Sequence, residues 1–521
     1  MLWQLFQSFW LPPAKDKDLI TVGIISEAPK VRFRSDGTLT ITVFSEDKSF
    51  EIYSPEHVTW TVDSATITRP ARVEYLPAVE TRLFMGEPPT TLALVAKWKS
   101  LGFAGVQWLG PKQMGISRGS GSLDRWILSL SPPTSLKNAQ ALCRKGRAST
   151  GFCRVLAYTR VPLVSKGVIR AENSSFEREF EGFISVKGER LVEVLDFVPE
   201  PRTNNTSIES YSSPLYVVPV EENQWALVQQ TTLGNYLKSV VPSEIFPNAP
   251  IEAVKAQAIV ARTYALLHLP ADAKMHPFSI CSTTLCQVYR GASITQANSD
   301  RAIEETDSLV LWGQKGQPAE TFYHGICGGH TEEKTEIWGM PSRSYLHGSK
   351  DSLKPWKALL KDSDVETYLK SADANTIYCG SSKYTNEERW RWERTLRTKE
   401  LHKILEKINL SPPLTGLKVL KRGVSGRVLS LEIKTRAASK IIYGELKIRM
   451  LFGGLLSSLV VFKPQTRGDE IVELNIIGAG YGHGVGMCQV GAIGRAEKGQ
   501  NFGEILKAYY PNTQLGTVML K

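Results

Sequence analysis

The segment VVPSEIFPNAPIEAVKAQAIVARTYAL, residues 240–266, gives the clearest indication of the fold. Its three prolines, from Pro242 to Pro250, are too closely spaced for one helix, so the segment is expected to open as a loop. Pro250 suits the first position of a helix, where a missing N–H costs nothing. From there the apolar residues repeat with a helical period and form one stripe: Ile251, Val254, Ala258, Ala261 and Ala265. The sequence therefore predicts a loop followed by an alanine-rich helix that packs closely against other backbone.

Charged side chains accompany the predicted loop and helix. Glu244 lies on the loop between two prolines, while Lys255 and Arg262 are seven residues apart and share one face of the helix. A carboxylate on a stiff loop beside two inward-pointing cations suits acid–base chemistry. The alternative is that Glu244 caps the helix and that Lys255 forms an ordinary helical ion pair with Glu252.

The same segment resembles the signature of the SpoIID/LytB family, which reads V-V-x-S-E-[MI] followed by EALKAQAVAARTYAL. The matching residues are Val241, Ser243, Glu244, Glu252, Ala253, Lys255, Ala256, Gln257, Ala258, Ala261, Arg262, Thr263 and Tyr264. Some members of this family are lytic transglycosylases that cut peptidoglycan strands lacking stem peptides, and others are named amidase enhancers. The resemblance implies that Glu244 is the essential acid–base residue and that Lys255 lies at the active site. Arg262 fits a structural role better.

Three further motifs resemble the family in the same order. They are CQVYRG (286–291), YHGICGGHT (323–331) and GHGVGMCQ (482–489), where Cys488 replaces the serine of the family pattern. Glycines in the last motif allow a ligand to approach the backbone, although they do not fit a dinucleotide-binding loop. The predicted substrate-binding residues are therefore Lys255, Arg262, Gln287, Tyr323, His483 and Gln489.

The cysteines allow two interpretations. His276, Cys281 and Cys286 have the spacing H-x4-C-x4-C, which predicts a structural zinc site with three of the four ligands identified. The alternative is that the two cysteines form a disulfide or stay as free thiols. No other cofactor is expected. Cys327, between two histidines, offers a thiol nucleophile as a different chemistry, but the family pattern does not require one.

The fold class expected is α+β. The predicted segments are an apolar N-terminal stretch (1–19), a β-rich region (20–86), a small α/β module (87–160), a β-rich connection (161–214) and a SpoIID-like catalytic domain (215–521). The module repeats the order helix, glycine, strand around Gly102 and Gly146, and it resembles a SPOR domain, which binds denuded glycan. The alternative is an insertion without a ligand.

Composition limits the choice of partner. The chain has 521 residues, a net charge of +11 and a pI near 9.1, which favours an anionic partner. No nucleic-acid-binding motif is present, so nucleic acid is not expected. The first residues, MLWQLFQSFWLPP, are too short to span a bilayer and lack the basic start of a secretory signal. They suit an atypical or trimmed signal, an interfacial anchor through Trp3, Phe6, Phe9 and Trp10, or simple packing.

The resemblance to the SpoIID/LytB family implies an enzyme that cleaves peptidoglycan glycan strands, as a lytic transglycosylase with Glu244 as its one general acid–base. The substrate expected is glycan stripped of stem peptides. The alternative is a non-catalytic glycan-binding protein that recruits or activates an N-acetylmuramoyl-L-alanine amidase. Either function implies a location outside the cytoplasm, in the cell wall or periplasm, with membrane association through the N-terminus as one option.

Overall fold

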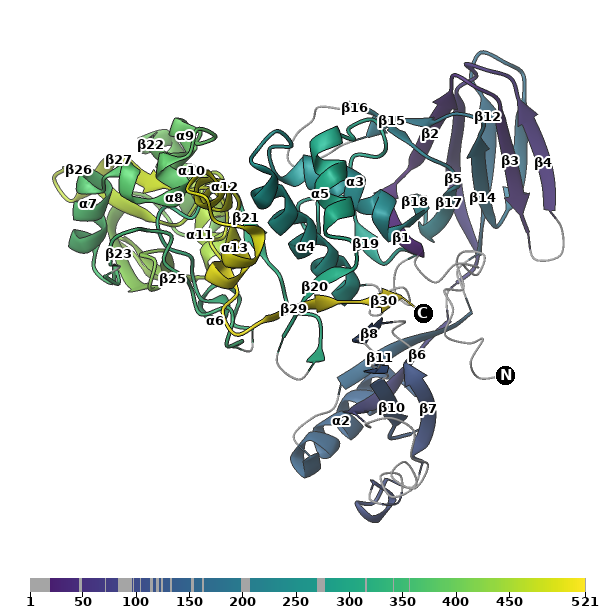
Figure 1. The fold of residues 1–521 in the computed structure, drawn as a ribbon, viewed down its shortest axis with the longest axis horizontal. Coiled ribbons are helices and arrows are strands. Elements are labelled where there is room, and N and C mark those ends of the chain that lie inside the picture. Colours follow the sequence, from purple (N-terminus) through teal and green to yellow (C-terminus); the bar gives the residue numbers. More distant parts are fainter. Residues whose placement is uncertain are drawn as a thin grey trace.

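A computed structural model of the protein describes residues 19–45, 49–70, 72–82, 96, 98–103, 105–112, 116–118, 121–122, 125–131, 134–150, 154–161, 164–197, 207–268, 277–313, 316–340, 342–355 and 357–520. Helices make up 28% and strands 39%, which confirms the α+β class (Figure 1). Within these ranges no helix has the length and apolar character needed to cross a bilayer. The predicted apolar segment 1–19 lies outside the described residues, apart from Leu19.

Two antiparallel sheets form a β-sandwich (Figure 1). The first has the order β19 (Ile280–Cys281), β1 (Leu19–Ala28), β18 (Gln224–Thr232), β17 (Leu215–Glu221), β14 (Phe183–Gly188), β3 (Leu39–Phe44) and β4 (Ser49–Ser54), with only β19 parallel to its neighbour. The second has the order β13 (Glu177–Glu181), β12 (Val164–Ala171), β5 (Trp60–Arg69), β2 (Lys30–Ser35), β15 (Val192–Phe197) and β16 (Ser207–Tyr211).

Alternating apolar residues fill the space between these sheets. In β3 every second residue is buried, as the two-residue period of a half-buried strand requires. Trp225 of β18 is fully buried and packs against Phe180 of β13, with ring centroids 5.6 Å apart. Gly167 of β12 makes room for it, because a Cβ there would lie 2.4 Å from the indole. One large side chain therefore joins the two sheets.

The sandwich divides the chain differently from the predicted segments. β17 and β18 lie in the middle of the first sheet, although they follow the predicted boundary at Leu215. The β-rich regions predicted over 20–86 and 161–214 contribute strands to both sheets. The physical reason is that strands pair with partners far away in sequence, such as β1 with β18, and local patterns do not show that pairing.

The inserted module begins earlier than predicted, because its central strand is β6 (Arg72–Arg82). Its sheet has the order β11 (Arg154–Val161), β6, β10 (Arg125–Ser129) and β7 (Gln107–Lys112). In the chain, α2 (Leu136–Thr150) connects β10 to β11. Residues 98–100 are helical and precede Gly102, whose φ is +82°. This is the split βαβ arrangement of ferredoxin-like modules. The second helix does not stop at Gly146 as predicted but continues to Thr150.

The module has its own small core, built on Trp98 and Phe103. Arg69 and Val164, which flank the insertion, are directly paired between β5 and β12. Replacing residues 70–163 by Asn-Gly should therefore close a two-residue hairpin. We expect the shortened chain to fold, with a melting temperature within about 5 °C of the full chain.

Circular dichroism during thermal unfolding measures this. The matched control ends after Val518 and thus loses only the pairing of the C-terminal β30 (Met519–Leu520) with β8 (Ile116–Arg118) of the module. An insoluble shortened chain beside a soluble control would contradict the expectation.

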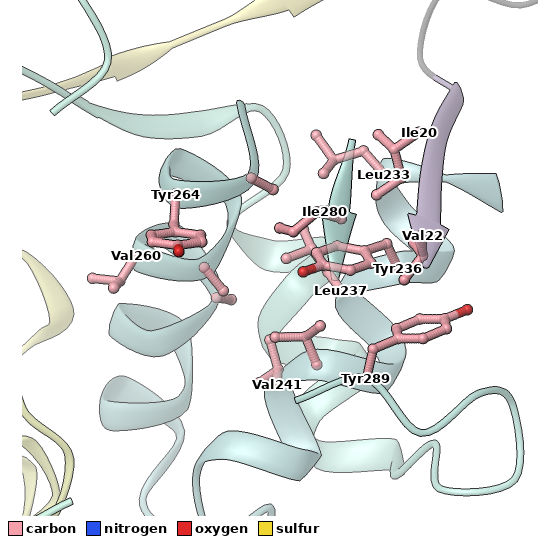
Figure 2. Packing of buried hydrophobic residues seen from close by; sticks show 14 of the residues in the cluster. Ile20, Val22, Leu233, Tyr236, Leu237, Val241, Val260, Tyr264, Ile280 and Tyr289 are labelled. Carbon is pink, nitrogen blue, oxygen red and sulfur yellow. The ribbon is translucent and has the colours of Figure 1, made fainter. Parts of the chain in front are cut away.

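Helix α3 (Leu233–Glu244) packs against β1 and β18 of the sandwich, and α4 (Ile251–His268) and α5 (Ala297–Glu305) pack against α3 and against each other. The predicted helix α4 begins at Ile251, and its predicted apolar stripe packs inward. Most of its other positions from 253 to 266 are buried too, so α4 is a central helix, covered all round. Figure 2 shows side chains of α3 and α4 in one core with Ile20 and Val22 of β1.

The prediction of a loop at Glu244 is wrong, because this residue belongs to a helix. Pro242 lies in the last turn of α3, and Glu244 is the final residue of that helix. The proline removes only one hydrogen bond of the helix, the one from residue 242 to the carbonyl of Lys238, because the helix ends two residues later. The Ser243 hydroxyl donates to the carbonyl of Ser239. Glu244 is therefore held at a helix end, in front of the short loop that leads to α4.

The C-terminal part forms a further lobe with two three-stranded sheets (Figure 1). They are β22 (Arg391–Arg397), β27 (Glu470–Ala479) and β26 (Val460–Arg467), and β23 (Leu414–Arg422), β24 (Val428–Thr435) and β25 (Ser439–Tyr443). Strands β23 and β24 form an antiparallel hairpin. Helices α10 (Thr398–Lys407) and α11 (Glu445–Leu451) share the core of this lobe.

Short elements connect this lobe to α4. β21 (Tyr323–His324) pairs in parallel with β28 (Met487–Cys488), and β28 leads directly into α12 (Gln489–Glu497). Helices α12 and α13 (Phe502–Tyr509) pack against α4. β20 (Leu309–Trp312) pairs with β29 (Gln514–Thr517). These contacts bring residues from the middle and the end of the chain to Glu244.

Candidate active site

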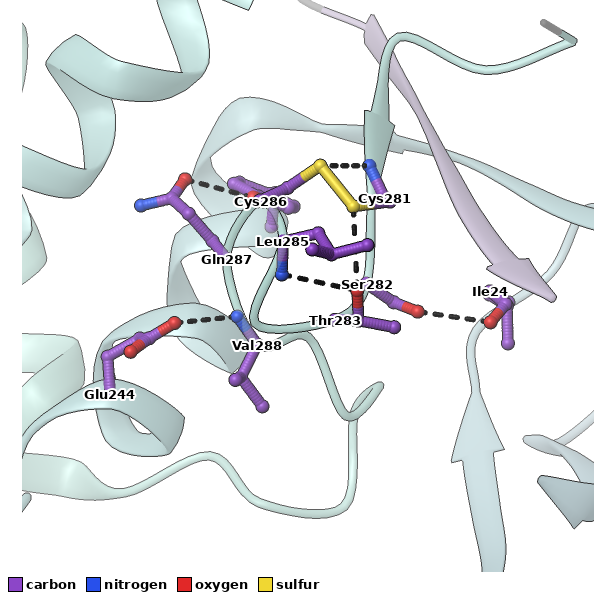
Figure 3. The surroundings of a disulfide bond; sticks show 10 residues. Ile24, Glu244, Cys281, Ser282, Thr283, Leu285, Cys286, Gln287 and Val288 are labelled. Carbon is purple, nitrogen blue, oxygen red and sulfur yellow. Dashed lines mark hydrogen bonds between the residues drawn. A yellow bond between two sulfur atoms is a disulfide. The ribbon is translucent and has the colours of Figure 1, made fainter. Parts of the chain in front are cut away.

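Glu244 is surrounded by polar groups from three distant segments. The backbone N–H of Val288 donates to its Oε1 at 2.6 Å, as Figure 3 shows. Tyr323 and Gln489 also hydrogen-bond to the side chain, and Gln489 Nε2 donates to the Glu244 backbone carbonyl at 2.6 Å. The structure thus brings together three predicted residues, Glu244, Tyr323 and Gln489, from α3, β21 and the start of α12.

A chain of hydrogen bonds extends behind Tyr323. Gln287 Nε2 donates to the Tyr323 hydroxyl at 3.0 Å, and the Tyr236 hydroxyl donates to Gln287 Oε1 at 3.0 Å. Gln287 is fully buried, so its amide is held in place rather than exposed to a ligand. It was predicted to bind substrate, but in the structure it orients Tyr323. Such buried and satisfied networks fix one geometry.

The environment of Glu244 raises the pKa of its carboxyl group from 4.5 to about 7, because burial penalises the charged form. The hydrogen bonds from Val288, Tyr323 and Gln489 oppose that shift. The tyrosines close by stay protonated, since burial raises the pKa of Tyr264 to about 12 and that of Tyr323 well above its ordinary value. A carboxyl group that titrates near neutral pH can both give and take a proton in one reaction cycle.

Replacing Tyr323 by Phe removes one hydrogen bond that lowers the pKa of Glu244. The pKa of that carboxyl group should then rise further, by about one unit or less, as expected for one hydrogen bond. NMR titration of isotope-labelled glutamate measures it directly. Tyr443→Phe, at an exposed strand position, is the control. An unchanged or lower pKa in Tyr323→Phe would contradict this assignment.

The two predicted cations do not reach Glu244. Lys255 lies between Glu252 and Glu305, with Nζ–oxygen distances of 2.9 and 2.8 Å. Arg262 is buried and donates to the carbonyls of Leu309 and Ile303. Burial lowers the pKa of the Arg262 guanidinium to about 10. The structure therefore gives Lys255 the ion pair with Glu252 that was its alternative interpretation, and it gives Arg262 a structural role.

His483 lies in the glycine-rich motif, ahead of β28. Its ring is 5.0 Å from that of Trp338 and 5.4 Å from that of His324, and its Nδ1 accepts from the Val485 N–H. Burial lowers the pKa of His483 to about 3, so the ring is neutral. A hydrogen bond to the backbone of Tyr323 connects it to the site. Its neutral ring and partial exposure suit sugar contact rather than proton transfer.

Cys281 and Cys286 form a disulfide in the structure (Figure 3). Sulfurs joined in this way cannot supply thiolates to a metal, so the structure has the disulfide alternative and not the predicted zinc site. His276, the third predicted ligand, lies outside the described residues. The disulfide closes the loop that precedes Val288, and Val288 provides the N–H donor to Glu244. It therefore shapes the wall of the candidate site.

The thiol-nucleophile alternative does not fit the structure, because Cys327 is fully buried. Other residues beside Glu244 were not predicted from the sequence. Tyr236, Tyr264 and the backbone of Val288 surround Glu244, yet tyrosines on amphipathic helices usually indicate core. Two signals were available: Tyr264 belongs to the family signature, and Tyr236 precedes Glu244 by eight residues on α3.

Two family models match the chain. Residues 221–312 match the Stage II sporulation protein family, and residues 332–486 match a Domain of unknown function (DUF8618). The chain carries a SpoIID domain. This confirms the resemblance seen in the sequence. The SpoIID match contains Glu244, α4 and Val288, whereas Tyr323 and Gln489 lie outside both matches.

Several relatives cover more of the chain than the SpoIID match alone. An uncharacterized protein of Brachyspira hyodysenteriae is 27% identical over 308 residues, 58% of this chain and 71% of the relative. The Amidase enhancer of Bacillus subtilis is 30% identical over 297 residues, 54% of this chain and 40% of the relative. Stage II sporulation protein D of Bacillus subtilis is 24% identical over 312 residues, 57% of this chain and 78% of the relative. The similarity thus extends beyond the SpoIID domain itself.

Proposed function

We propose that this protein is a peptidoglycan lytic transglycosylase in which Glu244 acts first as general acid and then as general base. The observation that carries the proposal is the position of Glu244 at the end of α3, where its surroundings raise its pKa to about 7. The SpoIID domain and the relatives named for sporulation and amidase enhancement support a role on peptidoglycan.

The proposed reaction needs one carboxyl group. Protonated Glu244 donates its proton to the glycosidic oxygen as the bond from C1 to that oxygen breaks. The resulting carboxylate then takes the proton of the muramic C6 hydroxyl, whose oxygen forms a new bond to C1. The products are a 1,6-anhydro end and a free hydroxyl, and Glu244 is protonated again, so no water is consumed.

The surroundings of Glu244 favour this route over hydrolysis. A hydrolase of the common type places a second carboxylate within about 5–10 Å, as nucleophile or as base for water. Among the described residues, the partners that lower the pKa of Glu244 against the effect of burial are Val288, Tyr323 and Gln489, and none of these three is an acid. The polar donors around it are suited to hold the carboxylate between its two proton transfers.

Digestion of purified, peptide-stripped glycan strands tests the proposal. Mass spectrometry should find 1,6-anhydro-muramic ends that increase with time. Ordinary reducing ends would indicate a hydrolase. Intact strands under conditions in which the protein binds them would overturn cleavage altogether.

A second candidate function rests on the relative named Amidase enhancer, which is 30% identical over 297 residues. In that case the protein binds glycan and raises the rate of an N-acetylmuramoyl-L-alanine amidase without cutting strands. An amidase digest to which the protein is added separates the two functions, with released stem peptides as the measurement. If Glu244→Gln stimulates the amidase as much as the wild type does, the result supports the enhancer role.

We further propose that the protein acts outside the cytoplasm. Disulfides such as Cys281–Cys286 persist in oxidising compartments, and the net charge of +11 suits anionic wall polymers. The SPOR-like module would then hold long glycan strands near the site. The chain with residues 70–163 replaced should bind long strands more weakly but turn over short fragments normally, since tethering helps only on a polymer.

A further inference from the structure

Four buried side chains converge behind the candidate active site, and nothing in the proposed reaction uses them. They are Cys327, Asp351, Cys379 and Cys488, all at 0% exposure. They come from four separate parts of the chain: the loop after β21, the loop at 351, the short helix α8 (Tyr378–Ser381), and β28. One ligand-type atom from each lies within 4.8 Å of all the others.

The spacing of these atoms is close to that of a tetrahedral metal site. The Sγ atoms of Cys327 and Cys379 are 3.5 Å apart, and Cys327 Sγ is 3.3 Å from Asp351 Oδ2. In a tetrahedral zinc site, Zn–S bonds of about 2.3 Å and Zn–O bonds of about 2.1 Å place ligand atoms about 3.5–3.8 Å from one another. The four atoms would need to move little to surround one ion.

The groups around the cluster are those that commonly surround a thiolate metal site. Backbone N–H groups of Cys327 and Gly491 donate to Cys488 Sγ at 3.1 and 3.3 Å, and that of Gly329 donates to Cys327 Sγ at 3.3 Å. Such donors stabilise negative charge on sulfur.

Asp351 is oriented by its other oxygen. The Tyr509 hydroxyl and Arg495 Nε lie 2.6 and 3.3 Å from Oδ1, so Oδ2 is left facing the sulfurs. Gly491 leaves space at that point, because a Cβ there would lie 2.3 Å from Oδ2. Arg495 also offsets part of the negative charge that three thiolates and a carboxylate would carry around a divalent ion.

We propose that Cys327, Cys379, Cys488 and Asp351 bind one zinc ion in a closed, structural site. Three thiolates and one carboxylate suit zinc far better than magnesium or calcium, and four protein ligands leave no position open for substrate. On binding, the three thiols each release a proton to solvent and the sulfurs form bonds to the metal. This site is distinct from the disulfide Cys281–Cys286 and from the proposed glycan cleavage. The zinc proposal therefore does not depend on that reaction.

The ion would connect the segments that carry the candidate site. Cys327 follows β21, which bears Tyr323, and Cys488 immediately precedes Gln489. β21 and β28 are paired over only two residues each, so the spacing between Tyr323 and Gln489 depends in part on a short pairing. A metal bound to both segments, and to α8 behind them, would fix that spacing.

Metal analysis of the full chain, purified under reducing conditions without chelators, tests the proposal. We expect about one equivalent of zinc by elemental analysis. Cys379→Ser should reduce it to about one tenth or less, whereas the matched control Cys281→Ser/Cys286→Ser should keep it. Since Cys379→Ser could fail to fold, a second measurement uses wild-type protein: after zinc removal, titration with Co²⁺ alone should saturate near one equivalent and show thiolate-to-cobalt charge-transfer absorption with the visible bands of a tetrahedral site.

Three outcomes would overturn the site. The first is a folded, metal-free chain that binds no Co²⁺. The second is peptide mapping that finds a disulfide between two of Cys327, Cys379 and Cys488 in protein purified without reductant and without metal. The third is zinc that disappears in Cys281→Ser/Cys286→Ser and persists in Cys379→Ser, which would place the ion at the other cysteines.

Discussion

Glu244→Gln is expected to lower the rate of glycan cleavage by about 10²–10⁴-fold, the usual cost of removing a general acid–base. Gln is nearly isosteric, and its carbonyl oxygen can still accept the hydrogen bond from Val288, so the fold and the binding of glycan should stay intact. The amide cannot donate a proton to the leaving oxygen or accept one from the C6 hydroxyl. Release of anhydro ends and binding to insoluble glycan should be measured on the same preparations.

The matched control for this substitution is Glu304→Gln on α5. Glu304 is an exposed glutamate that forms a surface ion pair with Lys238 and takes no part in the candidate site. It should leave cleavage unchanged. Cleavage by Glu244→Gln at the control's rate would show that another group delivers the proton.

The same substitution is expected to change the pH dependence of stability. The pKa of Glu244 is about 7 in the folded protein against an ordinary 4.5. Between these values the folded state holds a proton that the unfolded state has lost, so the free energy of unfolding falls as pH rises from about 4.5 to 7. A shift of this size corresponds to at most about 3 kcal/mol.

The amide introduced by Glu244→Gln does not titrate, so the variant lacks this penalty. We compare the free energy of unfolding of the variant with that of the wild type at each pH. This difference should shift in favour of the variant by up to about 3 kcal/mol between pH 4.5 and pH 8. Urea unfolding of both proteins at the two pH values measures the difference, and comparing variant with wild type cancels the contribution of every other titrating group. A difference that does not change with pH would mean that the pKa of Glu244 is not raised.

The sequence predicted the parts of the site that depend on local patterns. The helical period from Ile251 and the motifs around Tyr323 and Gln489 identified segments that the structure brings together around Glu244. The loop expected at Glu244 was wrong because proline in the last turn of a helix leaves little local signal. Lys255 and Arg262 share a helix face as predicted. Only the tertiary structure shows that Lys255 forms an ion pair with Glu305 and that Arg262 donates to the carbonyls of Ile303 and Leu309.

Features built from distant segments could not be predicted in this way. The sandwich pairs β1 with β18, about 200 residues later in the chain. The cluster of Cys327, Asp351, Cys379 and Cys488 has no repeated spacing, so no motif indicates it. The sequence drew attention to Cys281 and Cys286 because they are close together, and the structure joins those two in a disulfide.

Digestion of peptide-stripped glycan strands in ¹⁸O-labelled water tests the central claim most directly. If Glu244 transfers the C6 hydroxyl proton, mass spectrometry will show anhydro-muramic ends without ¹⁸O in the wild-type digest and none above background with Glu244→Gln. Reducing ends that carry ¹⁸O would contradict the account, because they require water as the attacking group and hence a hydrolase.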